Sequence, residues 1–147
     1  MRKREKLLLA AVLLLSGRAA AAQNLTTTGT PAAMTITTAI AGSDPASVSE
    51  NSTTYKVTAV GATTNHITAA LNANTPTGVT LTVSLAVTVG ATSSGPVALD
   101  VTARNVVTNI TVNQISNSIT YKLSALASAG VIASQSRTVT FTLVSGP

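Results

Sequence analysis

Few side chains in this chain of 147 residues could carry out chemistry. It has one histidine, His66, and no cysteine. Acid–base catalysis needs a proton carrier held beside a partner, and a metal site needs several ligands together. His66 follows a turn at 61–65 and, by the alternation of the next segment, is expected to face away from the core. We therefore predict neither a catalytic nor a metal-binding role for it.

The acidic residues outside the N-terminal segment are Asp44, Glu50 and Asp100. Asp44 and Glu50 flank one loop, whereas calcium sites take about six to eight oxygens, with several carboxylates among them. No G-x-S-x-G motif is present, and the Gly-rich loop at 90–95 is not followed by the lysine of a phosphate loop. The sequence predicts no catalytic residue, no cofactor and no metal, and it does not predict an enzyme.

Residues 1–22 have the pattern of a secretory signal peptide. Four basic residues within 2–6 precede an unbroken apolar run at 7–15, and small residues at 19–22 end the segment. The apolar run is shorter than the roughly 20 residues that span a bilayer. We expect cleavage after Ala22, giving a secreted or cell-surface protein without a stable transmembrane segment.

Removal of this segment also removes most of the positive charge. The whole chain has a formal net charge of +5, but only four basic and three acidic side chains lie beyond Ala22. A nucleic-acid-binding protein needs a dense basic footprint, so nucleic acid is not an expected partner. The remaining length, about 125 residues, is typical of one domain.

The composition and the spacing of apolar residues predict strands. All 26 threonines lie beyond the signal segment, and β-branched residues favour strands over helices. Apolar and polar residues alternate at 34–40, 55–59, 67–71, 79–87, 97–103, 110–112, 119–125 and 139–143. Turn-forming residues separate these segments. The predicted fold is all-β, an immunoglobulin-like antiparallel β-sandwich of about 7–8 strands.

We divide the exported chain into an N-terminal arm at 23–40 and a sandwich domain at 41–147. The arm begins polar and then alternates, which makes it a candidate donor strand for a neighbouring subunit. Its predicted contact residues are Met34, Ile36, Thr38 and Ile40. Two interpretations remain open, because a strand pattern does not say which sheet the strand joins. The segment either completes the sheet of another copy or is the first strand of its own domain.

The strand-like arm and the closing segment Arg137-Thr138-Val139-Thr140-Phe141-Thr142-Leu143-Val144 resemble bacterial pilin-type fibre subunits, including the spore-coat-U and archaic fimbrial group. Many of those subunits carry a disulfide, whereas this chain has no cysteine. The resemblance implies strand exchange between copies and export across an inner membrane. The expected partners are therefore the chain itself, as a homopolymer, and an export chaperone.

The function expected from the sequence is a structural subunit of an extracellular fibre, a pilus-like filament or a sheath. The alternative is a monomeric secreted or cell-surface binding module of the polysaccharide or adhesin type. Sugar sites favour exposed aromatic side chains with convergent polar groups. The three aromatic residues, Tyr55, Tyr121 and Phe141, all lie on predicted core faces, which favours the fibre subunit.

Overall fold

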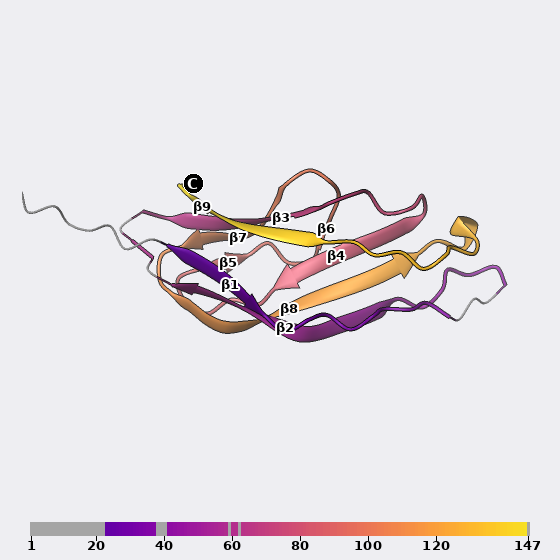
Figure 1. Ribbon diagram of the computed structural model, residues 1–147, viewed down its shortest axis with the longest axis horizontal. Coiled ribbons are helices and arrows are strands. Elements are labelled where there is room, and N and C mark those ends of the chain that lie inside the picture. The colour runs from indigo at the N-terminus through magenta and orange to yellow at the C-terminus, as the bar shows by residue number, and fades with distance from the viewer. Residues whose placement is uncertain (1–22, 38–40, 59, 62, 147) are drawn as a thin grey trace, which may run out of the picture.

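The computed structural model describes residues 23–37, 41–58, 60–61 and 63–146. The predicted signal peptide at 1–22 lies outside the described residues. The described chain forms two antiparallel sheets that face each other, as Figure 1 shows. This confirms the predicted all-β sandwich, with nine strands in the described part of the chain. Among these residues no helix is long and apolar enough to cross a bilayer.

The first sheet has five strands in the order β1-β2-β8-β4-β6, and the second has four in the order β5-β7-β3-β9. The strands are β1 (Asn24–Thr28), β2 (Val48–Thr58), β3 (Asn65–Leu71), β4 (Val79–Leu85), β5 (Thr92–Ser93), β6 (Val97–Ala98), β7 (Arg104–Ile110), β8 (Gln114–Ala125) and β9 (Val139–Ser145). A short 3-10 turn, η1 (Ala127–Ala129), follows β8. Two of the four sheet edges, β5 and β6, are only two residues long.

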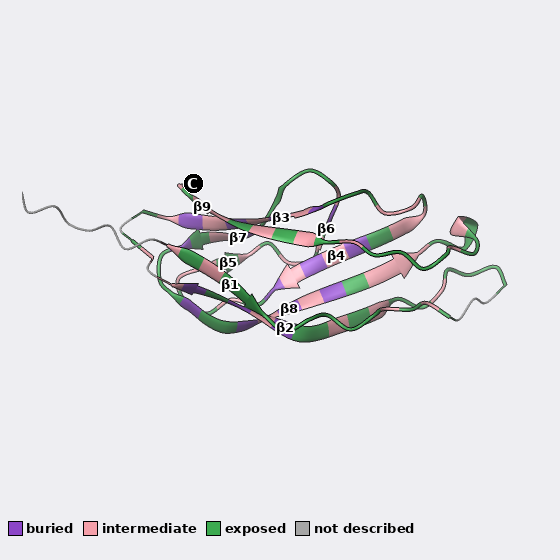
Figure 2. Ribbon diagram, in the orientation of Figure 1, coloured by how far each residue is buried: buried purple, intermediate pink, exposed green. Residues whose placement is uncertain are grey.

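The core forms where the alternating apolar faces of the two sheets meet. Along β3 every second residue is buried, and β4 shows the same period (Figure 2). This pattern follows from the strand geometry, because successive side chains point to opposite faces of a sheet. Tyr55 and Tyr121 are buried as predicted, while Lys56 and Lys122 on the same strands are exposed.

Buried polar groups close one end of the sandwich. The Oε1 atom of Gln114, which is fully buried, accepts hydrogen bonds from the amide and hydroxyl of Thr88 and from Nδ2 of Asn117, all at 2.8–2.9 Å. The hydroxyl of Tyr55 donates to the carbonyl of Ala86 at 2.6 Å. These bonds connect the segment after β4 to β8 and β2. They also give hydrogen-bond partners to buried polar groups, whose burial without partners is costly.

The strand expected at 34–40 is not present where the structure describes it. Residues 31–37 lie in no strand, and 38–40 are outside the described residues. The first strand is instead β1, at the polar start of the arm, where five residues pair with β2 without a register shift. The polar sequence of β1 did not predict this, because only Leu25 packs toward the core.

The strand expected at 97–103 is also shorter than predicted. Only β6 remains, because the chain crosses between the sheets directly after it. The amide of Leu99 donates to Leu81 in one sheet, and the carbonyl of Asp100 accepts from Leu71 in the other. Asp100 then accepts a hydrogen bond from the Thr102 amide, which forms a turn. A segment that joins two layers cannot continue as a strand of either.

Candidate functional site

The groups that could titrate or bind a metal are dispersed over the fold. His66 lies on β3 between two fully buried neighbours and points away from the core, as predicted. Its Nδ1 atom is 2.9 Å from the carbonyl oxygen of Gly146. Asp44 accepts a hydrogen bond from the Ala127 amide at 2.8 Å, and Asp100 forms an exposed ion pair with Arg104. The described residues include no group of three or more potential metal ligands.

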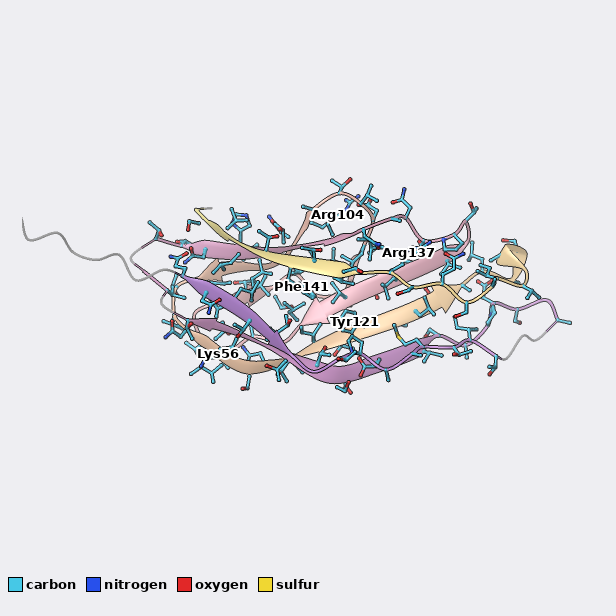
Figure 3. All side chains as sticks on the ribbon, viewed as in Figure 1. Lys56, Arg104, Tyr121, Arg137 and Phe141 are labelled. Atoms are coloured by element: carbon cyan, nitrogen blue, oxygen red, sulfur yellow. The ribbon has the colours of Figure 1, made fainter. Side chains whose placement is uncertain are left out.

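A large hollow on the described surface forms a groove on one side of the sandwich. It opens between the sheet that contains β4 and β8 and the edge strand β9. Apolar side chains from both sheets line it: Val79 and Leu81 of β4, Tyr121 and Leu123 of β8, and Val139 and Phe141 of β9. Figure 3 places Tyr121 and Phe141 on the two strands that flank this groove. We call it the side groove.

Two continuous segments outside the sheets also line the side groove. They are residues 29–37, from the arm, and residues 130–138, which lead into β9. Because no strand covers the groove, Leu123 and Phe141 remain half-buried although they lie on core faces. The volume of about 1380 Å³ exceeds the roughly 300–1,000 Å³ of most small-molecule pockets. Its size therefore suits an extended peptide better than a compact ligand.

The structure brings two of the four predicted contact residues to this groove. Met34 and Ile36 are half-buried and line it, and Met34 packs against the core cluster. Thr35 and Thr37, which follow them in turn, are exposed, so the alternation predicted from the sequence is present as an alternation in burial without a strand. Thr38 and Ile40 lie outside the described residues.

The electrostatics of the groove are nearly neutral. Among its described lining residues, Arg137 is the only one with a charged side chain. Its guanidinium donates hydrogen bonds to the Asn74 and Ser136 carbonyls and to the Gln135 side chain, which hold it at the rim. With one charged side chain in its described lining, the groove offers a ligand little opportunity for ion pairing. Recognition there depends on apolar contacts and backbone hydrogen bonds.

One carboxylate lies beside the arm. Glu50 Oε1 accepts a hydrogen bond from the Ser52 amide at 2.7 Å, where the pairing of β2 with β8 shifts register. Hydrogen bonds from Ser52 lower the pKa of Glu50, and the amide of Ala32 in the arm adds a smaller lowering. Burial raises the pKa of the neighbouring Tyr121 hydroxyl, and the charge of Glu50 contributes to that rise. The ionised carboxylate thus lies next to the middle of the arm.

The sequence did not predict the groove itself. The lining segment at 130–138 has no strand period, and the pairing of β1 with β2 places the arm across the opening. Comparison with protein-family models, with curated proteins and with solved structures gives no match to this chain. The groove and the arm are therefore the features of the described residues that bear on function.

Proposed function

We propose that this protein is a structural subunit of an extracellular fibre, a pilus-like filament or a sheath, whose copies join by β-strand addition. One observation carries the proposal. The sandwich is open along one side, and the groove there is lined by an arm in which half-buried Met34 and Ile36 alternate with exposed Thr35 and Thr37. We assign no catalytic role to the chain, and we propose that the main partner of the chain is another copy of the same chain.

The chemistry of the groove supports strand addition. An added strand gains affinity from backbone hydrogen bonds, and alternate side chains entering pockets give specificity. Met34 and Ile36 are two residues apart and both line the side groove, as such a strand requires. The nearly uncharged lining suits these apolar side chains.

The sheet edges beside the groove also favour pairing between copies. Natural sheets protect their edges with short strands, lysines, prolines or bulges. Strands β5 and β6 fit that description, since each has two residues. In contrast, β9 pairs with β3 over seven residues without a register shift and contains neither charge nor proline. The long, unprotected edges β9 and β1 both lie on the groove side of the sandwich.

The location of the fibre follows from the sequence. The N-terminal pattern supports export, after which the arm would begin within a residue or two of the new N-terminus. Export would deliver subunits to the cell surface, and an export chaperone would keep the exposed groove from pairing too early. This part of the proposal rests on the signal pattern and the resemblance to pilin-type subunits.

A charged residue in the arm tests the proposal. Met34→Asp places a carboxylate against the apolar groove, and burial of an unpaired charge is costly. We expect at least about a tenfold rise in the concentration needed for assembly, since roughly 1.4 kcal/mol corresponds to a factor of ten. Light scattering coupled to size-exclusion chromatography measures this concentration.

Thr35→Asp is the matched control, because it adds the same charge to the adjacent exposed position. Circular dichroism of both variants checks that the sandwich remains folded. Equal assembly of Met34→Asp and the unmodified mature chain would contradict a role for the arm in the contact.

A further inference from the structure

We propose that the side groove also binds a fatty acid, with the acyl chain between the two sheets and the carboxylate on the guanidinium of Arg137. This inference goes beyond the proposed fibre function and does not depend on it. It names a ligand for the space that the arm leaves open, the side chains that contact the acyl chain, and the side chain that binds the head group.

The arm lines the side groove without filling it. With the arm in place, a volume of about 1380 Å³ remains open. Two of the lining side chains, Leu126 and Val131, are large, apolar and exposed. Extensive apolar surface that stays open on a folded protein marks a place where a ligand or a partner binds. An apolar occupant in addition to the arm would remove this surface from water.

The position of the groove favours an acyl chain over a peptide in its inner part. Leu81, Leu123 and Phe141 line the groove from the core faces of both sheets. A core face presents side chains, whereas the N–H and C=O groups of a strand point toward the neighbouring strands of its own sheet. A peptide backbone between the layers would face side chains instead of ladder partners, and an unpaired buried amide is costly. A hydrocarbon chain has no such groups to pair.

Arg137 continues the inward-facing row of β9. Arg137, Val139 and Phe141 are spaced two residues apart and all line the groove, while Thr138 and Thr140 between them are exposed. Figure 3 labels Arg137 directly before β9 and Phe141 within it. At the usual rise of a strand, this row covers about 13 Å. A positive charge therefore lies at one end of an apolar row, which is the arrangement that an anionic amphiphile requires.

The guanidinium of Arg137 has no acidic partner among the described residues. The three acidic side chains there, Asp44, Glu50 and Asp100, each bond to other groups. Arg137 donates to three neutral oxygen atoms, one from each of its nitrogens. Because a guanidinium carries five N–H groups, one remains on each terminal nitrogen. A carboxylate can accept from both, and bidentate pairs of this kind are among the stronger hydrogen-bonded contacts.

Titration of the mature protein, residues 23–147, with laurate tests the inference. We expect saturable binding at one site per chain, measured by isothermal titration calorimetry below the concentrations at which the protein assembles and laurate forms micelles. Octanoate is four carbons shorter and should bind at least about tenfold more weakly, since each buried CH₂ changes the affinity by roughly threefold to fourfold. Dodecyltrimethylammonium has a chain of the same length with a positive head group, and it should bind more weakly than laurate.

Substitution of Arg137 tests the head-group contact separately. Arg137→Gln removes the charge, and we expect a loss of laurate affinity of about tenfold or more with no loss for dodecyltrimethylammonium. Arg137→Lys keeps the charge and should lose less laurate affinity than Arg137→Gln. The matched control is Arg104→Gln, because Arg104 is exposed and lies outside the groove lining. It should bind laurate as the unmodified protein does, and circular dichroism checks that each variant is folded.

Several results would overturn the inference. They are the absence of saturable laurate binding, equal affinities for laurate and octanoate, and equal losses in Arg137→Gln and Arg104→Gln. Dodecyl phosphate that binds at least tenfold more tightly than laurate would assign the groove to a phosphate-bearing amphiphile and overturn the fatty acid.

The fibre function is tested independently, by assembly of the ligand-free protein. Filaments from a protein that does not bind laurate would overturn this inference alone. Laurate binding with the expected dependence on Arg137, in a protein that never assembles, would support this inference and contradict the fibre.

Discussion

Deletion of residues 24–40 is expected to abolish assembly and leave a folded monomer. The deletion removes β1 and the groove-lining part of the arm, and with them the only segment that we propose to pass between copies. The core cluster of fully buried residues begins at Tyr55, so the truncated domain retains all of it. Sedimentation velocity over a range of concentrations should show one species at the monomer mass.

The same deletion should also lower stability to a limited extent. Leu25 and Met34 are partly buried against the core, and loss of that burial costs about 1 kcal/mol each. Domains of this size have about 5–15 kcal/mol of stability, so most of the fold remains. A matched control keeps the length of the arm and replaces Leu25, Met34 and Ile36 by serine. Filaments from either variant would contradict the proposal.

Replacement of Ile119 by alanine is expected to destabilise the domain by about 2–5 kcal/mol, because Ile119 is fully buried and its loss leaves a cavity. Ile119 lies in the middle of β8, opposite Thr53 of β2 and Leu85 of β4, where the first sheet has neighbours on both sides. We expect a fall in Tm of about 10 °C or more, measured by thermal denaturation followed by circular dichroism.

The matched control for this substitution lies on the same strand. Ile115 is 63% exposed, so Ile115→Ala removes the same atoms from a position outside the core. We expect a change within about 0.5 kcal/mol there. Similar losses for the two variants would mean that the register of β8 differs from the one described, because a shift by one residue exchanges the faces of a strand.

Alternation predicted the strands that form the centre of the sandwich. The segments at 79–87 and 119–125 correspond to β4 and most of β8, which pair at seven positions without a register shift. One face of these strands is buried and the other is not. The alternation of apolar and polar residues in the sequence therefore matches the alternation of inward and outward side chains in the structure. The outward direction of His66 follows from the same rule.

Strand β7 shows why other elements could not be predicted. Val106 and Val107 are adjacent and both fully buried, which breaks the alternation. The pairing of β3 with β7 shifts register twice near Ile67 and so allows consecutive residues to face inward. Such bulges arise from pairing with a partner strand, and the sequence of the strand alone does not show them.

The candidate site was predicted only in part, for a similar reason. The alternation of Met34 and Ile36 identified a segment with one apolar side, and both residues line the side groove. The sequence placed a strand there, whereas the ladder forms earlier, at β1. The groove depends on how the arm and residues 130–138 lie across two sheets. That arrangement depends on contacts between segments far apart in the sequence, and no local sequence pattern predicts it.

The central claim is that copies of this chain join through the arm, and imaging of the mature protein tests it most directly. Residues 23–147 should be purified, concentrated in steps and examined by negative-stain electron microscopy at each step. We expect filaments of uniform width that lengthen with concentration and disappear when residues 24–40 are deleted. Isolated particles of single-domain size at every concentration would contradict it.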